Sequence, residues 1–399
     1  MGRRGNFGRP SRQAILMIRT FLRHAGPRAA FLLLALLPVR AWADSCPEDC
    51  SEPAPSINIY SHTAASHLGP ATLGALPRVY VPNRSSNSVT VIDTMTLKEV
   101  DRFPVGSKPQ HVVPSWDLKT LWVANNGTGK NGSLTPIDPM TGKPGPQIAV
   151  DDPYNLYFMP GAAIVVDEAL ERLDFRDPHT MALMSSLPTP TCPGINHAEF
   201  SVDGAYAIFT CEYGNGGLAK IDLKNQKVLG HLDFSKMGMP QDIRLSPDGK
   251  VFYVADMMND GVFLVDGDSF KEIGFIPTGI GAHGFVVSRD GKRLYVSNRG
   301  SHKMEQGQAK GPGSVTVIDF ATRAVVTQWP IPGGGSPDMG NVSADGKQLW
   351  LSGRFDSAAY MIDTTSGAVT KFRVGSEPHG LTVWPQPGRY SQGHTGNMR

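Results

Sequence analysis

The sequence predicts an all-β protein, a seven-bladed β-propeller of four-stranded blades closed by a C-terminal innermost strand that completes the first blade. Two repeated patterns carry this prediction. From residue 76 onward, seven repeats each contain a strand that ends in an apolar residue followed by Asp, and a strand of the LYVSN type also occurs seven times. A third observation is that the last strand of the chain has no partner in its own repeat. Repeats of about 40–50 residues holding four strands are typical of propeller blades.

The apolar-Asp pairs mark the end of the third strand in each expected blade. Their separations run from 36 to 53 residues, which is too long for leucine-rich or helical repeats. We expect each Asp to cap the following turn through side-chain to backbone hydrogen bonds. The third copy lacks an Asp-Gly turn, and its ALERL stretch also fits a helical turn, but we count it as a blade. The Asp residues are Asp93, Asp138, Asp174, Asp222, Asp266, Asp319 and Asp363.

The second strand of each expected blade gives an independent count. These strands are rich in Val, Ile, Tyr and Trp, which suit half-buried pleated strands, and SPDGK-type turns separate several of them from the preceding strand. They read VYVPN from Val79, LWVAN from Leu121, AIVVD from Ala163, AIFTC from Ala207, FYVAD from Phe252, LYVSN from Leu294 and LWLSG from Leu349.

The order of strands predicts how the ring closes. Residues 76–106 supply the second, third and fourth strands of a blade but no innermost strand. Residues 377–384 form an innermost strand with nothing after it. Pairing the last strand with the first blade removes two exposed sheet edges, which otherwise invite aggregation.

The N-terminus is typical of an export signal. Arginines precede an apolar run at 29–39, and Ala41-Trp42-Ala43 is a small-x-small cleavage site. The run is about half of the ~20 residues that a membrane-spanning helix needs, so no anchor is expected after cleavage. We therefore divide the chain into a signal peptide at 1–43, an N-terminal segment at 44–75, the propeller at 76–388 and a tail at 389–399, and expect a periplasmic or secreted monomer.

All four cysteines follow the expected cleavage site. An even count in an oxidising compartment favours two disulfides. Cys192 and Cys211 fall in one expected hairpin and are paired on that ground, which leaves Cys46 to pair with Cys50.

The balance of charge argues against a nucleic-acid partner. The formal net charge is +2, from 38 Lys and Arg against 36 Asp and Glu, and seven of the arginines precede residue 30. A protein that binds nucleic acid draws most of its affinity from clustered basic residues, and the body of this chain has no such surplus.

The strands LYVSN, FYVAD and LWVAN, with SVTVID at 88–93 and 314–319, resemble the YVTN-repeat β-propeller family over residues 76–387. This superfamily is similar to surface-layer proteins, 6-phosphogluconolactonase-like proteins and the d1-haem domain of nitrite reductase. The resemblance implies the fold and leaves the function open, because one fold hosts many functions. The long insertion at 299–313 departs from the repeat pattern.

Polar residues gather where the innermost strands begin, at the mouth of the expected channel. Aligning the repeats places four histidines and two aspartates at the second or third residue of these strands. Neighbouring strand residues alternate faces, so the six cannot all point identically. The candidates for ligand or metal binding are His111, His197, Asp242, His283, Asp338 and His379, with Asn155, Asn196, Arg299 and Arg354 as secondary candidates.

Two interpretations of these residues stay open. They satisfy backbone groups at the channel mouth, or they bind a metal, a metallocofactor or a polar ligand, since His with Asp is an ordinary ligand set for first-row metals. The leading functional hypothesis is a non-catalytic binding or scaffold protein that holds a small ligand or a protein partner at the channel mouth.

Two alternatives to a non-catalytic binding protein belong to the class of enzymes and cofactor carriers. One is a carrier of a divalent metal or d1-type haem, with oxidoreductase-like chemistry included, and the other is a lactonase-like hydrolase. A lactonase is expected to hold its metal with carboxylates, typically including Glu, and the aligned positions offer no Glu. The sequence identifies no catalytic residue.

Overall fold

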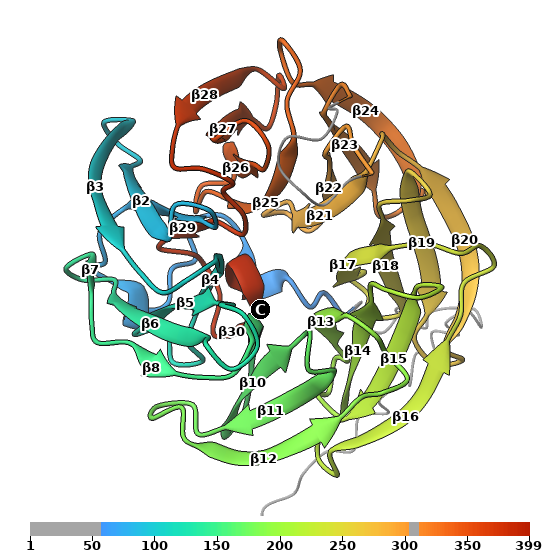
Figure 1. Cartoon of the computed structure of the whole chain (residues 1–399). Coiled ribbons are helices and arrows are strands. Elements are labelled where there is room, and N and C mark those ends of the chain that lie inside the picture. Colours follow the sequence, from blue (N-terminus) through green and yellow to red (C-terminus); the bar gives the residue numbers. More distant parts are fainter. Residues whose placement is uncertain (1–56, 303–310) are drawn as a thin grey trace, which may run out of the picture. The chain divides into compact units, whose positions relative to one another are not determined.

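The protein is described by a computed structural model that covers residues 57–302 and 311–399. These residues form seven blade sheets, one two-stranded sheet and three short 3-10 helices, and the blades are arranged around a central channel (Figure 1). The predicted all-β, seven-bladed propeller is confirmed. The expected signal peptide and the expected Cys46–Cys50 pair lie outside the described residues.

The first four blades follow the chain from β1 to β16. Blade 1 contains β29 (Thr382–Trp384), β1 (Arg78–Asn83), β2 (Ser88–Asp93) and β3 (Lys98–Pro104). Blade 2 contains β4 (Pro109–Pro114), β5 (Leu121–Asn125), β6 (Ser133–Asp138), β7 (Lys143–Pro144) and β8 (Ile148–Ala149). Blade 3 contains β9 (Pro153–Met159), β10 (Ala162–Asp167), β11 (Arg172–Arg176) and β12 (Leu183–Pro188). Blade 4 contains β13 (Ile195–Phe200), β14 (Tyr206–Cys211), β15 (Gly217–Asp222) and β16 (Lys227–Leu232).

The remaining three blades complete the ring. Blade 5 contains β17 (Pro240–Leu245), β18 (Val251–Asp256), β19 (Gly261–Asp266) and β20 (Lys271–Pro277). Blade 6 contains β21 (Ala282–Val287), β22 (Arg293–Asn298), β23 (Ser314–Asp319) and β24 (Ala324–Pro330). Blade 7 contains β25 (Pro337–Val342), β26 (Gln348–Gly353), β27 (Ala358–Asp363) and β28 (Val369–Arg373). The 3-10 helices η1 (Ser61–Thr63) and η2 (Pro70–Thr72) precede blade 1.

The ring closes as the order of strands predicted. Strand β29 pairs antiparallel with β1, with Val383 opposite Val79, and so completes blade 1. The chain just before β29 also pairs with blade 1, because the His379 amide donates to the Pro82 carbonyl at 3.0 Å. The innermost position of blade 1 is therefore supplied by residues almost 300 positions away from its other strands, and no sheet edge is left open at the seam.

The apolar core lies between neighbouring blades, and the channel is lined by polar side chains. Middle strands such as β1 and β22 are buried on both faces, which explains why their sequences show continuous apolar runs. Between blades 1 and 2, for example, Tyr80 and Val91 pack with Val112 and Val123.

In six blades the Asp of the apolar-Asp pair caps the following turn, as predicted. In blade 3 the prediction is wrong. Asp93, for instance, accepts hydrogen bonds from the Met95 and Thr96 amides at 2.9 and 2.8 Å. In blade 3 the expected residue, Asp174, lies inside β11, is buried, and binds Arg176 at 2.9 Å instead. Asp177 caps the turn there, accepting from the Thr180 amide at 2.7 Å. The third copy thus appeared short because its marker was assigned three residues too early.

The predicted Cys192–Cys211 disulfide is confirmed, with the two Cα atoms 4.8 Å apart. It ties the chain just before β13 to the last residue of β14 in the same blade. Within the described ranges, no helix is both long and apolar enough to span a bilayer.

After the closing strand, residues 385–399 return to the centre of the ring. They form β30 (Ser391–Gly393), η3 (His394–Gly396) and β31 (Asn397–Met398), and the C-terminus lies at the channel in Figure 1. The last residue, Arg399, is 4% exposed and binds Glu199 of blade 4 at 2.6 Å. Gly393 lies against the Tyr157 ring, where a Cβ would overlap it. We call residues 385–399 the C-terminal plug.

Candidate functional site

The six primary candidates all lie in the channel, and none is more than 1% exposed. Each sits near the start of an innermost strand, but at one of two positions. His283 and Asp338 are second in their strands, and His379, which repeat alignment places at the same position, lies three residues before β29. His111, His197 and Asp242 are third in their strands. Since successive strand residues face different ways, this offset separates the six side chains into two groups. We call residues at the second position the mouth layer and residues at the third position the inner layer.

In the mouth layer, Asp338 is the centre of an ion-pair network. Its carboxylate lies 2.8 Å from the Nδ1 atoms of both His283 and His379. The Arg299 guanidinium binds the same carboxylate at 3.0 Å. His379 also contacts the Tyr154 hydroxyl through Nε2, at 3.2 Å. Two imidazoles are therefore held in fixed orientations by one carboxylate.

Burial and charge decide the protonation of this network. Arg299 and the two imidazoles hold the pKa of Asp338 well below its usual value, although burial opposes this. Burial lowers the pKa of His283 to about 4 and that of His379 to about 3. At neutral pH the carboxylate is therefore ionised and both imidazoles are neutral, each with its Nδ1 facing Asp338.

In the inner layer, Asp242 has a different set of partners. Its Oδ1 accepts from Arg244 at 2.7 Å and lies 2.9 Å from His394 Nε2. Its Oδ2 accepts from the Phe285 amide at 2.9 Å. Burial raises the pKa of Asp242, but Arg244 and His394 outweigh it, so the pKa is lowered and the carboxylate is ionised.

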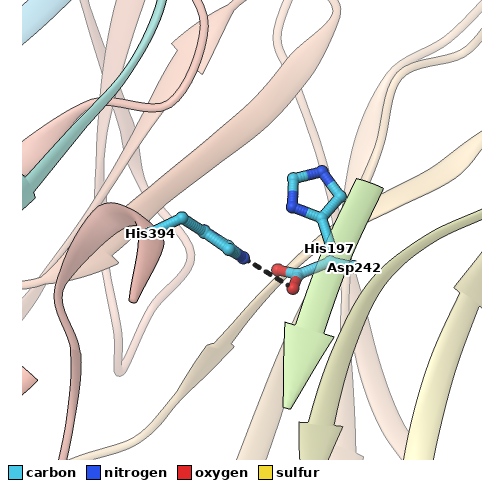
Figure 2. A group of neighbouring side chains, drawn as sticks. All are labelled: His197, Asp242 and His394. Carbon is cyan, nitrogen blue, oxygen red and sulfur yellow. Dashed lines mark hydrogen bonds and ion pairs between the residues drawn. The ribbon is translucent and has the colours of Figure 1, made fainter. Parts of the chain in front are cut away.

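His394 was not expected from the sequence and comes from the C-terminal plug. It is fully buried, and its ring centre lies 4.6 Å from that of His197 and 5.3 Å from that of His111. Figure 2 shows His394 directed at Asp242 with His197 beside them. One ligand atom from each of His197, Asp242 and His394 falls within a group no more than 4.8 Å across.

Two imidazoles of the inner layer have nitrogen atoms without hydrogen-bond partners. Both ring nitrogens of His111 are buried and unpartnered, as is Nε2 of His197. Nδ1 of His197 lies 3.0 Å from the Asn155 amide nitrogen. Leaving a buried polar atom unpaired costs about 1–3 kcal/mol, so such atoms call for a water or an ion.

The inner-layer imidazoles are neutral because burial lowers the pKa of His111, His197 and His394. Neighbouring imidazoles lower the pKa of His111 and His197 further. A neutral imidazole is the form that binds a metal ion. Gly380, the third residue of the blade 1 segment, leaves the space that the His111 ring fills, since a Cβ there would overlap the ring.

The four secondary candidates divide between the layers. Asn155 contacts His197 in the inner layer, whereas Arg299 belongs to the Asp338 network. Asn196 donates to Glu212 at 2.6 Å, and Arg354 binds Glu377 at 3.3 Å. Glu212 and Glu377 were not expected from the sequence, because they lie outside the aligned strand positions.

The fold and the channel define a seven-bladed propeller with a buried site of imidazoles and carboxylates on its axis. Over residues 41–387 the chain matches the YNCE-like beta-propeller family, and it belongs to that family.

Known proteins are similar to this chain at low identity. Antigen Lp49 of Leptospira interrogans is 28% identical over 193 residues, a match that covers 42% of this chain and 38% of Lp49. A Bacteroides uniformis propeller provisionally assigned as a 6-phosphogluconolactonase has 16% identity and a TM-score of 0.61, over 76% of this chain and 98% of that one. Dihydro-heme d1 dehydrogenase NirN has 16% identity and a TM-score of 0.54, over 77% and 75%. The two solved structures show a shared fold. The activities in their names are those of the two proteins and are not assigned to this chain.

Proposed function

We propose that this protein is an exported, non-catalytic binding protein that holds one transition-metal ion in the inner layer of its channel. His197, Asp242 and His394 are the primary ligands, and His111 is the candidate fourth. The observation that carries the proposal is the pair of neutral imidazoles with unpartnered nitrogens beside the compact His197, Asp242 and His394 group.

The donor set fits a metal for which nitrogen is a favoured ligand. Imidazole suits zinc, copper, iron and nickel, and four ligands are usual for zinc. Binding through His197 Nε2 requires the proton on Nδ1. The Asn155 amide accepts that proton only if its oxygen turns to the ring and gives up the Leu156 amide, which it now accepts from at 2.9 Å. The Arg244 guanidinium shares Asp242 and disfavours a second cation, so the imidazoles must supply most of the binding.

The channel does not fit a d1-type haem. The imidazoles that would ligate its iron, His111 and His197, are 0% exposed, and the C-terminal plug occupies the space between the blades. A macrocycle would require the plug to leave. Lactonase-like chemistry is no better supported, because Asp242 and Asp338 already bind Arg244 and Arg299.

Metal analysis of the exported protein tests the proposal. We expect chelator-stripped protein to bind one Zn²⁺ or Cu²⁺ per chain, and the double variant His197→Ala/His394→Ala to bind at least tenfold more weakly. The matched control is His231→Ala, which removes an exposed imidazole that also faces a carboxylate, that of Asp233. If wild type and the double variant bind the two metals equally, the proposal is wrong.

A further inference from the structure

A pair of carboxyl groups lies at the channel mouth, away from the imidazoles. Glu168 follows β10 and Glu212 follows β14, so neighbouring blades 3 and 4 each contribute one. The Asn196 side chain contacts both carboxyl groups and so places them next to each other. Glu212 is 1% exposed, whereas Glu168 is partly exposed and gives solvent a path to the pair.

Two amides of the mouth layer converge on this pair. The Asn196 amide nitrogen lies 2.6 Å from Glu212 Oε2 and 3.5 Å from Glu168 Oε1. The Gln241 amide nitrogen lies 3.0 Å from Glu212 Oε1. Both amide side chains are 0% exposed, and the carbonyl oxygen of each has no hydrogen-bond partner.

The unpartnered oxygens belong to the same amide groups whose nitrogens contact the carboxyl pair. In an amide group the oxygen and nitrogen are bonded to one carbon, so each oxygen lies within about 5 Å of the Glu212 carboxylate. An amide turned by half a rotation presents oxygen where it now presents nitrogen. That orientation is unfavourable beside a carboxylate alone and favourable once a cation lies between them.

Acidic groups outweigh basic groups around Glu168 and Glu212. Asp152 acts on Glu168 as a further negative charge, and Arg84 acts on it as a positive charge. Arg84 is already bound to Glu377 at 2.9 Å. Burial and the neighbouring Glu212 raise the pKa of Glu168 well above its usual value, which favours the protonated form of Glu168 when no cation is bound.

We propose that Glu168, Glu212 and the side-chain carbonyl oxygens of Asn196 and Gln241 form a site for a hard divalent cation such as Ca²⁺ at the channel mouth. The donors are all oxygen atoms, which Ca²⁺ prefers and which distinguish this site from the imidazoles below it. The proposal does not depend on metal binding in the inner layer.

Calorimetric titration of the full exported protein with Ca²⁺, after dialysis against a chelator, tests this site. We expect one Ca²⁺ to bind per chain, and Glu168→Gln to weaken binding at least tenfold. The matched control is Glu171→Gln, which makes the same change of charge in the same β10–β11 connection. Glu212→Gln is the second variant, and thermal melting establishes that each variant is folded.

Two further measurements separate this site from the inner layer. The His197→Ala/His394→Ala protein should bind Ca²⁺ as wild type does, and Glu168→Gln should bind Zn²⁺ as wild type does. The proposal is overturned if wild type binds no Ca²⁺, or if folded Glu168→Gln and Glu212→Gln both bind it as tightly as wild type. If wild type binds Ca²⁺ but not Zn²⁺, only the inner-layer site is rejected.

Discussion

The two layers of the channel contain the same residue types, but these residues have different roles. In the mouth layer, Asp338 orients His283 and His379, and both imidazoles are committed to it. In the inner layer, Asp242 orients only His394, while His111 and His197 keep unpartnered nitrogens. In the mouth layer the carboxylate binds both neighbouring imidazoles, although Nε2 of His283 is also unpartnered, whereas in the inner layer the carboxylate binds one imidazole and leaves His111 and His197 for a candidate metal site. One residue of offset along a strand decides which arrangement arises.

The largest expected effects come from two truncations. They separate the role of β29 in closing the ring from the role of the C-terminal plug in the channel. Removing residues 377–399 takes away β29 and should leave no cooperatively folded protein, because blade 1 loses its innermost strand. Removing only residues 389–399 keeps β29 and should leave a folded propeller that binds Zn²⁺ at least tenfold more weakly, since His394 is lost. Thermal melting with Zn²⁺ titration measures both. Zinc affinity unchanged in the shorter truncation would contradict the role given to the plug.

Asp338→Asn should be the most damaging single substitution in the mouth layer. It removes the charge that compensates Arg299, and breaking a buried ion pair costs about 3–5 kcal/mol. Denaturant unfolding measures the change, and the exposed Asp233→Asn serves as the control. Zinc affinity at a temperature where the variant is folded should stay within about threefold of wild type. A variant as stable as wild type would mean that the network does not stabilise the fold.

Two alanine substitutions compare free with committed imidazoles. His111→Ala should weaken Zn²⁺ binding about tenfold, or ~1.4 kcal/mol, because it removes a neutral imidazole from the inner layer. His283→Ala should change the affinity by less than threefold, because that imidazole faces Asp338. Competition with a chromophoric chelator gives both values. Equal losses in the two variants would mean that the layers act as one site.

The smallest expected effect is a pH dependence of stability in metal-free protein. The pKa of His283 is lowered to about 4 and that of His379 to about 3, against about 6.5 in the unfolded chain. Below pH 6.5 the unfolded state therefore takes up protons that the folded state does not, and stability falls as pH drops.

From pH 7 to 6 these two imidazoles together should remove about 1 kcal/mol from the free energy of unfolding. The double variant His283→Gln/His379→Gln should show a smaller fall over that range, whereas His231→Ala should match wild type. Denaturant unfolding at the two pH values measures this fall in the free energy of unfolding. The same fall in the double variant as in wild type would assign the effect to other groups.

The sequence by itself determined the fold, the number of blades and the way the ring closes. Each blade repeats the same strand and turn chemistry, so local signals recur seven times, and errors such as Asp174 for Asp177 do not change the count. The Cys192–Cys211 pair was also local, since both cysteines belong to one hairpin. Repeat alignment likewise identified six residues that the structure places in the channel.

Only the tertiary structure decided how those six residues divide into two layers and which other residues contact them there. His394 lies 152 residues from Asp242 in the sequence and outside the repeat, so no periodic signal marks it. Glu168 and Glu212 lie in connections between strands, and only the packing of neighbouring blades brings them together. Contacts between distant segments depend on where the whole ring places them, which a strand pattern does not contain. The propeller follows from periodicity, whereas its channel chemistry follows from closure of the ring and the return of the chain's last residues to its axis.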